Sequence, residues 1–297
     1  MSVVFLCAVG DIMIGRTFND LLAPMSKSDL WGNTKNVFNT AHIVVGNLQT
    51  TLCDGNLTNK MQNKHGNHFY LEPELAGVLR DIPFDYLGLS SSHALDYGQS
   101  GLEQTLAALK TLEIQCSGAH TTRPNAREPA VFKMKLLTQT PTKISRIAIF
   151  SAVDHSEEIK ADDNSSGIYY IDAHHPDSAI DFFRYYASRH PRTFIVLCYH
   201  WKHDGRRQQA QKLFEAGVDL ILGVCPQSMI TTEPYEIING KYVIYNLGNF
   251  INDYRVDPDK RNDLGFIARV AINLQTRTID GVEMYPTITH NRQVNLL

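Results

Sequence analysis

Short apolar runs alternate with amphipathic stretches along most of the chain. The runs are rich in β-branched residues and end at glycine or polar residues, which is typical of strands in a buried sheet. They are Val3–Val9, Ile43–Gly46, Tyr86–Leu89, Ile147–Phe150, Phe194–Tyr199, Leu220–Val224 and Tyr242–Asn246. Between them, apolar residues at three- and four-residue spacing predict helices over Gly101–Leu112, Ser178–His190 and Arg206–Ala216. Strands that alternate with helices predict an α/β fold with a largely buried sheet.

The pattern changes in the last part of the chain. Apolar and polar residues alternate through Phe266–Asn273 and Gly281–Pro286, which predicts an antiparallel hairpin. We therefore expect a core over residues 1–252, and C-terminal strands over residues 253–297 that close the same single large domain.

Composition and charge narrow the range of functions. The 297 residues are 43% hydrophobic and 20% charged, as in ordinary globular proteins. The formal net charge of -3, without a cluster of Lys and Arg, predicts no nucleic-acid partner. Five widely spaced cysteines favour reduced thiols and a cytoplasmic location. The apolar run at the start has no basic flank and is too short to span a bilayer, so no membrane segment is expected. The oligomeric state cannot be predicted.

Polar residues follow the carboxyl ends of the expected strands. In open α/β sheets this edge is where binding sites form. The residues are Asp11, Asn47, Gln49, Ser90 to His93, His200 and Cys225 to Gln227. Two polar stretches without periodicity, Cys53–Phe69 and Ala152–Asn164, are expected as long loops that wall or cover such a site. Segments far apart in the sequence are therefore expected to meet at one crevice.

An ordered set of motifs resembles that of the CapA (PGA-cap) family, which is associated with bacterial capsule and poly-γ-glutamate synthesis. Each motif alone is weak, but six in the same order, over roughly residues 3 to 252, are specific. They are Gly10 to Met13, Asn47 to Gln49, His93 to Gly98, His200-Trp201, Ala216-Gly217 with Asp219 to Gly223, and Tyr245 to Phe250. The resemblance implies a layered α/β/β/α sandwich with a buried mixed sheet, like that of metallophosphatases.

By this resemblance, six residues stand at or near the family's metal positions. Asp11 and His200 keep the family's residue type. At the other four positions, Gln49 stands in place of Glu, Ser92 in place of Asn, and Cys225 and Gln227 each in place of His. A neutral amide or hydroxyl binds a hard dication less well than a carboxylate does. A two-metal centre needs several carboxylates, so the ordinary dinuclear mechanism is not expected to operate unchanged.

Several of these residues also have a plain structural interpretation. Asp11 could cap a turn, and His200 could be an ordinary residue at a strand end, but the motif set favours the ligand roles for both. Cys225 could supply a thiolate to zinc, or it could be a small buried apolar residue, and we favour the second interpretation.

Four further residues carry charge or proton-transfer chemistry. The resemblance implies that His93 is a general acid or an anion-stabilising imidazole oriented by Asp96, while capping of a helix near Gly98 explains the pair equally well. Lys202 adds a positive charge at a point where the family continues with glycine and then an acidic residue. Lys202 and Arg16 are therefore candidate contacts for an anion.

Two hypotheses follow. In the first, the chain is a CapA-like hydrolase or transferase that holds one zinc or manganese ion through Asp11, His200 and Cys225, while His93 and Asp96 transfer protons. In the second, it binds no metal and uses the crevice as a non-catalytic binding module for an anionic small molecule or polymer. Kept scaffold motifs beside lost ligands favour the second hypothesis.

Overall fold

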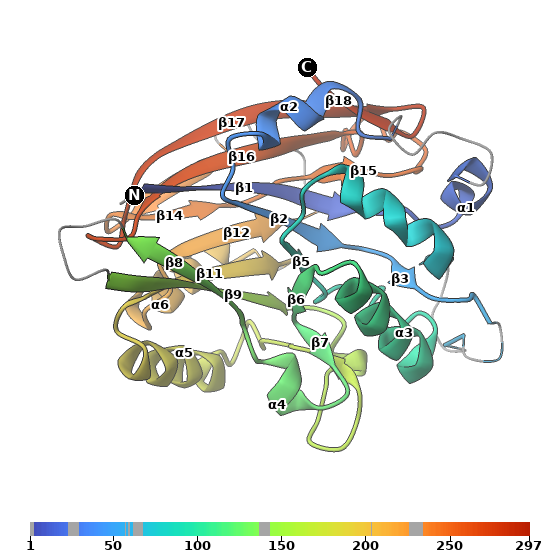
Figure 1. Cartoon of the computed structure of the whole chain (residues 1–297). Helices are drawn as coiled ribbons and strands as arrows, with labels where there is room; N and C mark the ends of the chain where they lie inside the picture. The colour runs from blue at the N-terminus through green and yellow to red at the C-terminus, as the bar shows by residue number, and fades with distance from the viewer. Residues whose placement is uncertain are drawn as a thin grey trace.

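Two β-sheets lie face to face at the centre of the molecule (Figure 1). The computed structural model describes residues 3–22, 30–56, 58, 60–61, 68–136, 143–202, 204–225 and 234–297. The first sheet has the strand order β18-β17-β16-β1-β2-β5-β6, and β15 also pairs with β1. Its strands are β1 (Val3–Ile12), β2 (Ile43–Leu48), β5 (Tyr86–Gly88), β6 (Gln115–Ser117), β15 (Asn249–Ile251), β16 (Leu264–Asn273), β17 (Thr278–His290) and β18 (Gln293–Leu296).

The second sheet has the order β13-β14-β12-β11-β9-β8. Its four central strands are parallel, while both edge strands pair antiparallel with their neighbours. The strands are β8 (Ala130–Leu136), β9 (Lys143–Val153), β11 (Thr193–His200), β12 (Leu220–Val224), β13 (Tyr235–Ile238) and β14 (Lys241–Ile244). The central parallel strands place the carboxyl ends of β9, β11 and β12 at one edge.

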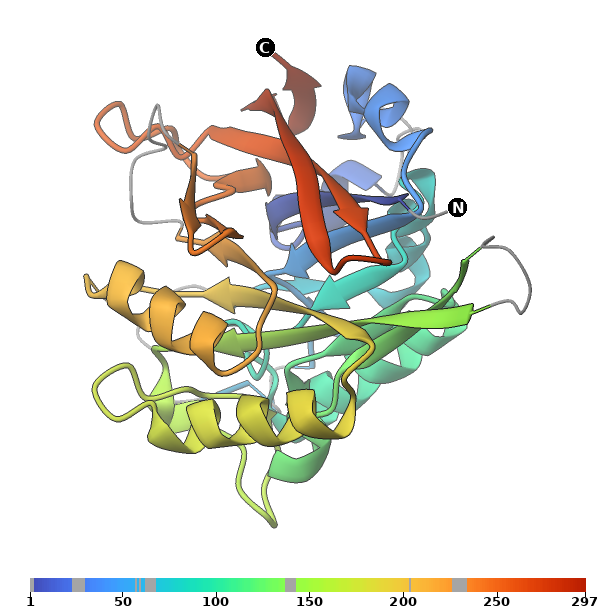
Figure 2. The same cartoon turned by 90° about the vertical axis from the view of Figure 1, so that its left-hand side faces the viewer.

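Alternating side chains along the strands build three apolar layers. In β1, Leu6 and Ala8 belong to the core between the two sheets, while Cys7 and Val9 belong to the core on the outer face of the first sheet. Helix α3 (Gly98–Thr111) packs on that outer face through residues such as Leu102. The outer face of the second sheet is covered by α5 (Asp177–Arg189) and α6 (Arg206–Glu215), as Figures 1 and 2 show. The expected α/β/β/α layering is therefore confirmed.

The long elements match the sequence-based expectations. The three expected helices are α3, α5 and α6, and each differs by at most three residues at either end. The expected C-terminal hairpin is β16 and β17, and it extends the first sheet because β16 pairs antiparallel with β1. None of the helices in the described parts of the chain is long and apolar enough to cross a membrane.

Shorter elements complete the fold. The remaining helices are α1 (Thr17–Leu22), α2 (Lys35–Phe38) and α4 (Arg123–Ala126), with 3-10 helices η2 (Gly32–Thr34), η4 (Pro73–Asp81) and η5 (Glu157–Ile159). The remaining strands are β3 (Thr51–Leu52), β4 (Tyr70–Leu71), β7 (Ala119–His120) and β10 (Gly167–Ile168).

Two boundaries differ from expectation. Strand β1 continues past Val9 to Ile12, and its pairing with β15 shifts register between Asp11 and Ile12, so Asp11 lies within the strand end and not after it. Strand β9 continues to Val153, into a stretch expected as loop.

Candidate functional site

Backbone contacts at the end of β1 set the position of Asp11. The Asp11 amide donates to the carbonyl oxygen of Gly248 at 3.0 Å, and Asp11 lies opposite Asn47 of β2 and Asn249 of β15. A β-carbon on Gly10 would lie 1.9 Å from the Gly248 oxygen, so only glycine fits here. Two segments that are more than 230 residues apart in sequence are thereby held against each other.

A pocket of about 390 Å³ opens where the carboxyl ends of the strands meet. Seven of the residues expected at the site line it: Asp11, Gln49, Ser92, His93, His200, Lys202 and Cys225. Further residues line it as well: His155 and Ser156, which lie in a stretch expected to wall or cover the site, and Trp201, Asn249, Tyr254, Asp257, Lys260 and Asn262. Gln227 lies outside the described residues, so the structure does not place it.

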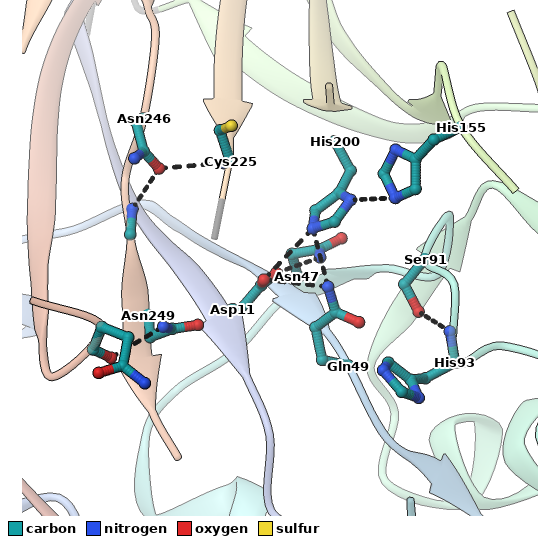
Figure 3. A network of polar contacts seen from close by, with 12 residues as sticks. Asp11, Asn47, Gln49, Ser91, His93, His155, His200, Cys225, Asn246 and Asn249 are labelled. Atoms are coloured by element: carbon teal, nitrogen blue, oxygen red, sulfur yellow. Dashed lines mark hydrogen bonds and ion pairs between the residues drawn. The ribbon is translucent and has the colours of Figure 1, made fainter. Parts of the chain in front are cut away.

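Asp11, Gln49 and His200 are in mutual contact at the inner end of the pocket (Figure 3). Gln49 Nε2 donates to Asp11 Oδ2 at 2.9 Å and lies 2.8 Å from His200 Nε2. The distance between Asp11 Oδ2 and His200 Nε2 is 3.3 Å. Asn47 Nδ2 donates to the other carboxylate oxygen at 2.6 Å. All three central side chains are buried, with exposed fractions of 2%, 4% and 4%. The amide group of Gln49 therefore links the only two candidate ligands that match the family's residue types.

His155 and Asp154 extend this contact on the other side of His200. His200 Nδ1 lies 3.1 Å from His155 Nε2, and His155 Nδ1 lies 3.4 Å from Asp154 Oδ1. Since an amide nitrogen only donates, His200 Nε2 must accept from Gln49, and its proton is then on Nδ1. That proton is donated to His155 Nε2, whose own proton is on Nδ1 and faces Asp154. One chain of hydrogen bonds thus runs from Asp154 to Asp11, with both imidazoles neutral.

The environment of His155 agrees with this arrangement. Burial, above all, lowers the pKa of His155, Lys202 lowers it further, and Asp154 acts in the opposite direction. The sequence-based prediction placed residue 155 in a loop that walls or covers the site, but gave its side chain no chemical role. It follows directly after β9, which is parallel to β11, so the rule that located His200 at a strand end could also have located His155.

His93, on the pocket wall, forms a second polar pair with Asp96 behind it. His93 Nδ1 lies 2.8 Å from Asp96 Oδ2, the same oxygen accepts the backbone amide of Phe69 at 2.6 Å, and the His93 ring stacks on Phe69 with centroids 3.9 Å apart. Asp96 is fully buried and does not line the pocket. These contacts favour the interpretation that Asp96 orients His93 over the interpretation that the pair caps a helix.

The other expected residues differ in their positions. Cys225 is 3% exposed and belongs to the apolar cluster beneath the second sheet, and its backbone amide donates to Asn246 Oδ1 at 3.0 Å. Arg16 is absent from the residues that line the pocket. Its guanidinium lies over the Phe69 ring at 5.8 Å, with Nε 3.6 Å from Asp253 Oδ1.

The residues at the inner end fit a dinuclear metal centre poorly. Among the described residues, no group of three or more His, Cys, Asp or Glu side chains is arranged to hold a metal ion. Asp11 is the one carboxylate in the central contact, and the Gln49 amide directs its hydrogens at both Asp11 and His200. Those hydrogens point at the atoms that would face a cation, so the central contact offers a metal ion poor ligands.

Comparison with known proteins decides the family. The model of the bacterial capsule synthesis protein family PGA_cap matches residues 5–254. The chain belongs to this family. Among relatives, PGA biosynthesis protein CapA of Bacillus subtilis is 28% identical over 253 residues, which are 82% of this chain and 62% of that protein. A probable polyglutamine synthesis accessory protein of Mycobacterium tuberculosis is 28% identical over 240 residues, which are 75% of this chain and 60% of that protein. This PGA_cap member thus spans about 60% of the length of the curated relatives it matches.

Solved structures are similar in fold. A novel phosphatase from Mycoplasma pneumoniae superposes with a TM-score of 0.57 at 11% identity, over 97% of this chain and 94% of that one. A hypothetical protein from Thermus thermophilus superposes with a TM-score of 0.50 at 11% identity, over 95% of this chain and 98% of that one. At this level of identity, the likeness places this PGA_cap member on a phosphatase-like scaffold and assigns no activity.

Proposed function

We propose that this PGA_cap protein is an accessory protein of capsule or poly-γ-glutamate synthesis, and that its pocket binds an anionic ligand without dinuclear-metal catalysis. The first part is supported by the family and by the names of the relatives from Bacillus subtilis and Mycobacterium tuberculosis. The second part is carried by one observation, the Gln49 amide nitrogen within 2.9 Å of both Asp11 and His200. A neutral donor there joins the two groups that a cation would otherwise join.

Two exposed lysines at the pocket support an anionic ligand. Lys202 and Lys260 both line it, together with the acidic residues Asp11 and Asp257. Each oxygen of Asp11 accepts an amide hydrogen, from Asn47 and from Gln49, which reduces the repulsion that its charge exerts on an incoming anion. The volume of the pocket lies in the range of small-molecule sites. A long acidic polymer would enter by one end or one segment.

Calorimetric titration in the presence of chelator tests this function. We expect phosphate or short glutamate oligomers to bind the native protein, and Lys202→Met with Lys260→Met to weaken binding about tenfold, since exposed ion pairs contribute about 0–1 kcal/mol each. Lys133→Met is the matched control, because Lys133 is exposed on the edge strand β8, is absent from the pocket lining, and should leave affinity unchanged. Absence of binding to every anion would refute the proposal.

A metal-dependent hydrolase is the second candidate function. The observation in its favour is the pairing of His93 with Asp96 at 2.8 Å on the pocket wall, which suits proton transfer. Elemental mass spectrometry of the purified protein separates the two candidates. One equivalent of zinc or manganese, lost with activity on Asp11→Asn, would favour the hydrolase, whereas sub-stoichiometric metal is expected under our proposal.

A further inference from the structure

A second pocket, of about 270 Å³, lies between α4 and α5 on the outer side of the second sheet. Its walls are α4 with the following Arg127, part of the segment 157–172, and the first turn of α5, and Figure 1 shows both helices on the same side of that sheet. It shares no lining residue with the pocket described above. Residues 155 and 156 line the first pocket, whereas the residues that follow line this one. The α4–α5 pocket is therefore a separate cavity.

The three basic side chains that line the α4–α5 pocket differ in their partners. Arg123 Nη2 lies 2.8 Å from Asp163 Oδ1 and Lys160 Nζ lies 2.6 Å from Glu157 Oε1, and all four of these side chains are exposed. Arg127 is half-buried, and no carboxylate in the described residues forms an ion pair with it. A charge that is partly removed from water is costly unless it is paired. Arg127 therefore holds a positive charge that the surrounding carboxylates leave unneutralised.

Aromatic rings hold the guanidinium of Arg127 in place. Its Cζ lies 4.1 Å from the centroid of the Phe182 ring and 5.5 Å from that of the Tyr169 ring. The two rings pack edge to face, with their centroids 6.2 Å apart. Stacking occupies the faces of a guanidinium and leaves its N–H groups at the edge, in the fork that matches two oxygens of a carboxylate or phosphate. Arg127 is thus fixed in advance for an oxyanion.

The acidic side chains of the α4–α5 pocket already have donors. Asp162 Oδ1 accepts the backbone amides of residues 164 and 165 at 2.7 and 2.6 Å, and Asp172 Oδ1 accepts those of residues 174 and 175 at 2.9 and 3.2 Å. Glu157 is paired with Lys160. Glu157 and Asp162 are also exposed, so solvent and salt screen their repulsion of an incoming anion. The half-buried charge of Arg127 is screened less.

We propose that the α4–α5 pocket binds the oxyanion group of a small molecule, a phosphate or a carboxylate, through the N–H edge of Arg127. The pocket is larger than one such group, and buried apolar side chains such as Ile168, Ile171 and Ala179 also line it. The rest of the ligand therefore has an apolar part. This site does not depend on the function proposed above, because none of its residues belongs to the first pocket.

Phosphate and acetate titrations followed by ¹H–¹⁵N correlation spectra locate the site. We would use the variant Lys202→Met with Lys260→Met, which removes both lysines of the first pocket. At least one of the two anions should shift the backbone amides of Tyr170 and Ser178, which line the α4–α5 pocket. The anion that does so identifies the group carried by the ligand. Shifts at these amides with neither anion would overturn nothing less than the site itself if absent throughout the titration.

Replacing Arg127 tests its role in the same background. Arg127→Met should weaken binding about tenfold, since it removes a charged, bidentate partner. Arg127→Lys keeps the charge and loses the fork, so it should weaken binding by a smaller factor, about threefold. Arg184→Met is the matched control, because Arg184 is 63% exposed on α5, pairs with Asp181, and does not line the pocket. It should leave the affinity unchanged.

The outcomes distinguish this inference from the proposed function. Shifts of Tyr170 and Ser178 that are weakened by Arg127→Met support the α4–α5 site, even if the first pocket binds no anion. Equal affinity with and without Arg127 would overturn it, because the exposed Arg123 and Lys160 would then account for binding. Shifts confined to the first pocket of the native protein would also overturn it and leave the proposed function in place. The spectra of the native protein need no variant of Arg127, so the test holds even if Arg127→Met folds poorly.

Discussion

At the scale of single residues, the proton positions around His200 distinguish this pocket from a metal centre. A metal-bound imidazole directs a lone pair at the ion, and here the same lone pair of Nε2 accepts the Gln49 amide. The neighbour on the other ring nitrogen decides which tautomer is present. That neighbour is His155, which accepts from His200 at 3.1 Å and faces Asp154 with its other nitrogen. His155 is therefore a positioning residue for the central contact.

Removing the acceptor at position 155 should change the tautomer of His200. In the native protein, long-range ¹H–¹⁵N correlation spectra should show His200 protonated at Nδ1. In His155→Leu we expect the proton on Nε2, facing Asp11, which displaces the Gln49 amide and lowers the free energy of unfolding by about 1–3 kcal/mol because a buried polar group loses its partner. His155→Gln keeps an acceptor oxygen and should retain the native tautomer. Identical spectra for the native protein and the leucine variant would contradict the hydrogen-bond chain.

At the scale of elements, the strand ends hold the side chains of the site in place. The backbone at these strand ends should keep its position when those side chains are replaced. β1 pairs with β2 through Asp11 and Asn47, and β11 pairs with β9 up to His200 and Val153, so the backbone of each contributing segment is fixed by its neighbour. The sheet edge is thus a scaffold on which different side chains can be presented. The family's metal-site residues should function on it if they are returned.

Restoring four residues together should create a metal site. The variant Gln49→Glu, Ser92→Asn, Cys225→His and Gln227→His returns the residue types of the family at these positions. With manganese or zinc at one hundred times the dissociation constant, the melting temperature should rise by about 5 °C or more, which follows from linkage of binding to folding. The native protein should show little shift. Gln49→Glu alone should lower stability, because it would place two buried carboxylates about 3 Å apart with no cation between them.

Tight metal binding by the native protein would contradict this prediction. If it already binds one equivalent tightly, and if Cys225→His reduces that affinity, Cys225 is a working ligand and the site has not lost its metal.

The sequence predicted long elements better than short ones, and strand ends better than loops. Periodicity located α3, α5, α6 and most strands of the two large sheets, because buried faces impose a regular spacing on the chain. It did not locate β8, an edge strand with few buried side chains, or η4, which is helical for only nine residues. The motifs supplied Asp11, Gln49 and His200, but not the contacts between them. Which amide nitrogen faces which imidazole depends on packing between segments about 40 to 190 residues apart, and no local pattern encodes it.

At the scale of the whole molecule, the two sheets are joined by a polar contact as well as by the apolar layer between them. Asp219, at the start of β12 in the second sheet, is 6% exposed and accepts the backbone amide of Ile195 at 2.8 Å. It also accepts from Arg277, which lies in the turn between β16 and β17 of the first sheet, and Lys241 is 3.6 Å away. Burial lowers the pKa of Lys241, and Asp219 acts against that shift.

Asp219→Asn should therefore weaken the whole fold. We expect a loss of about 1–3 kcal/mol in the free energy of unfolding, a value that allows for partial solvent screening of the two cations. Urea denaturation measures it. Asp181→Asn is the matched control, since the Asp181 and Arg184 side chains are 73% and 63% exposed and such pairs contribute about 0–1 kcal/mol. Equal losses in the two variants would show that Asp219 is not a link between the sheets.

The fit of Gly10 against the carbonyl of Gly248 has a consequence for how sites of this kind diverge. The contact leaves no space for a methyl group, and it sets Asp11 and Asn249 relative to each other. A substitution at position 10 would move two acceptors apart while every residue that touches a ligand stayed the same. The spacing of side chains in the pocket therefore depends on a glycine that never meets the ligand. A comparison of relatives restricted to the residues of the pocket would overlook this requirement.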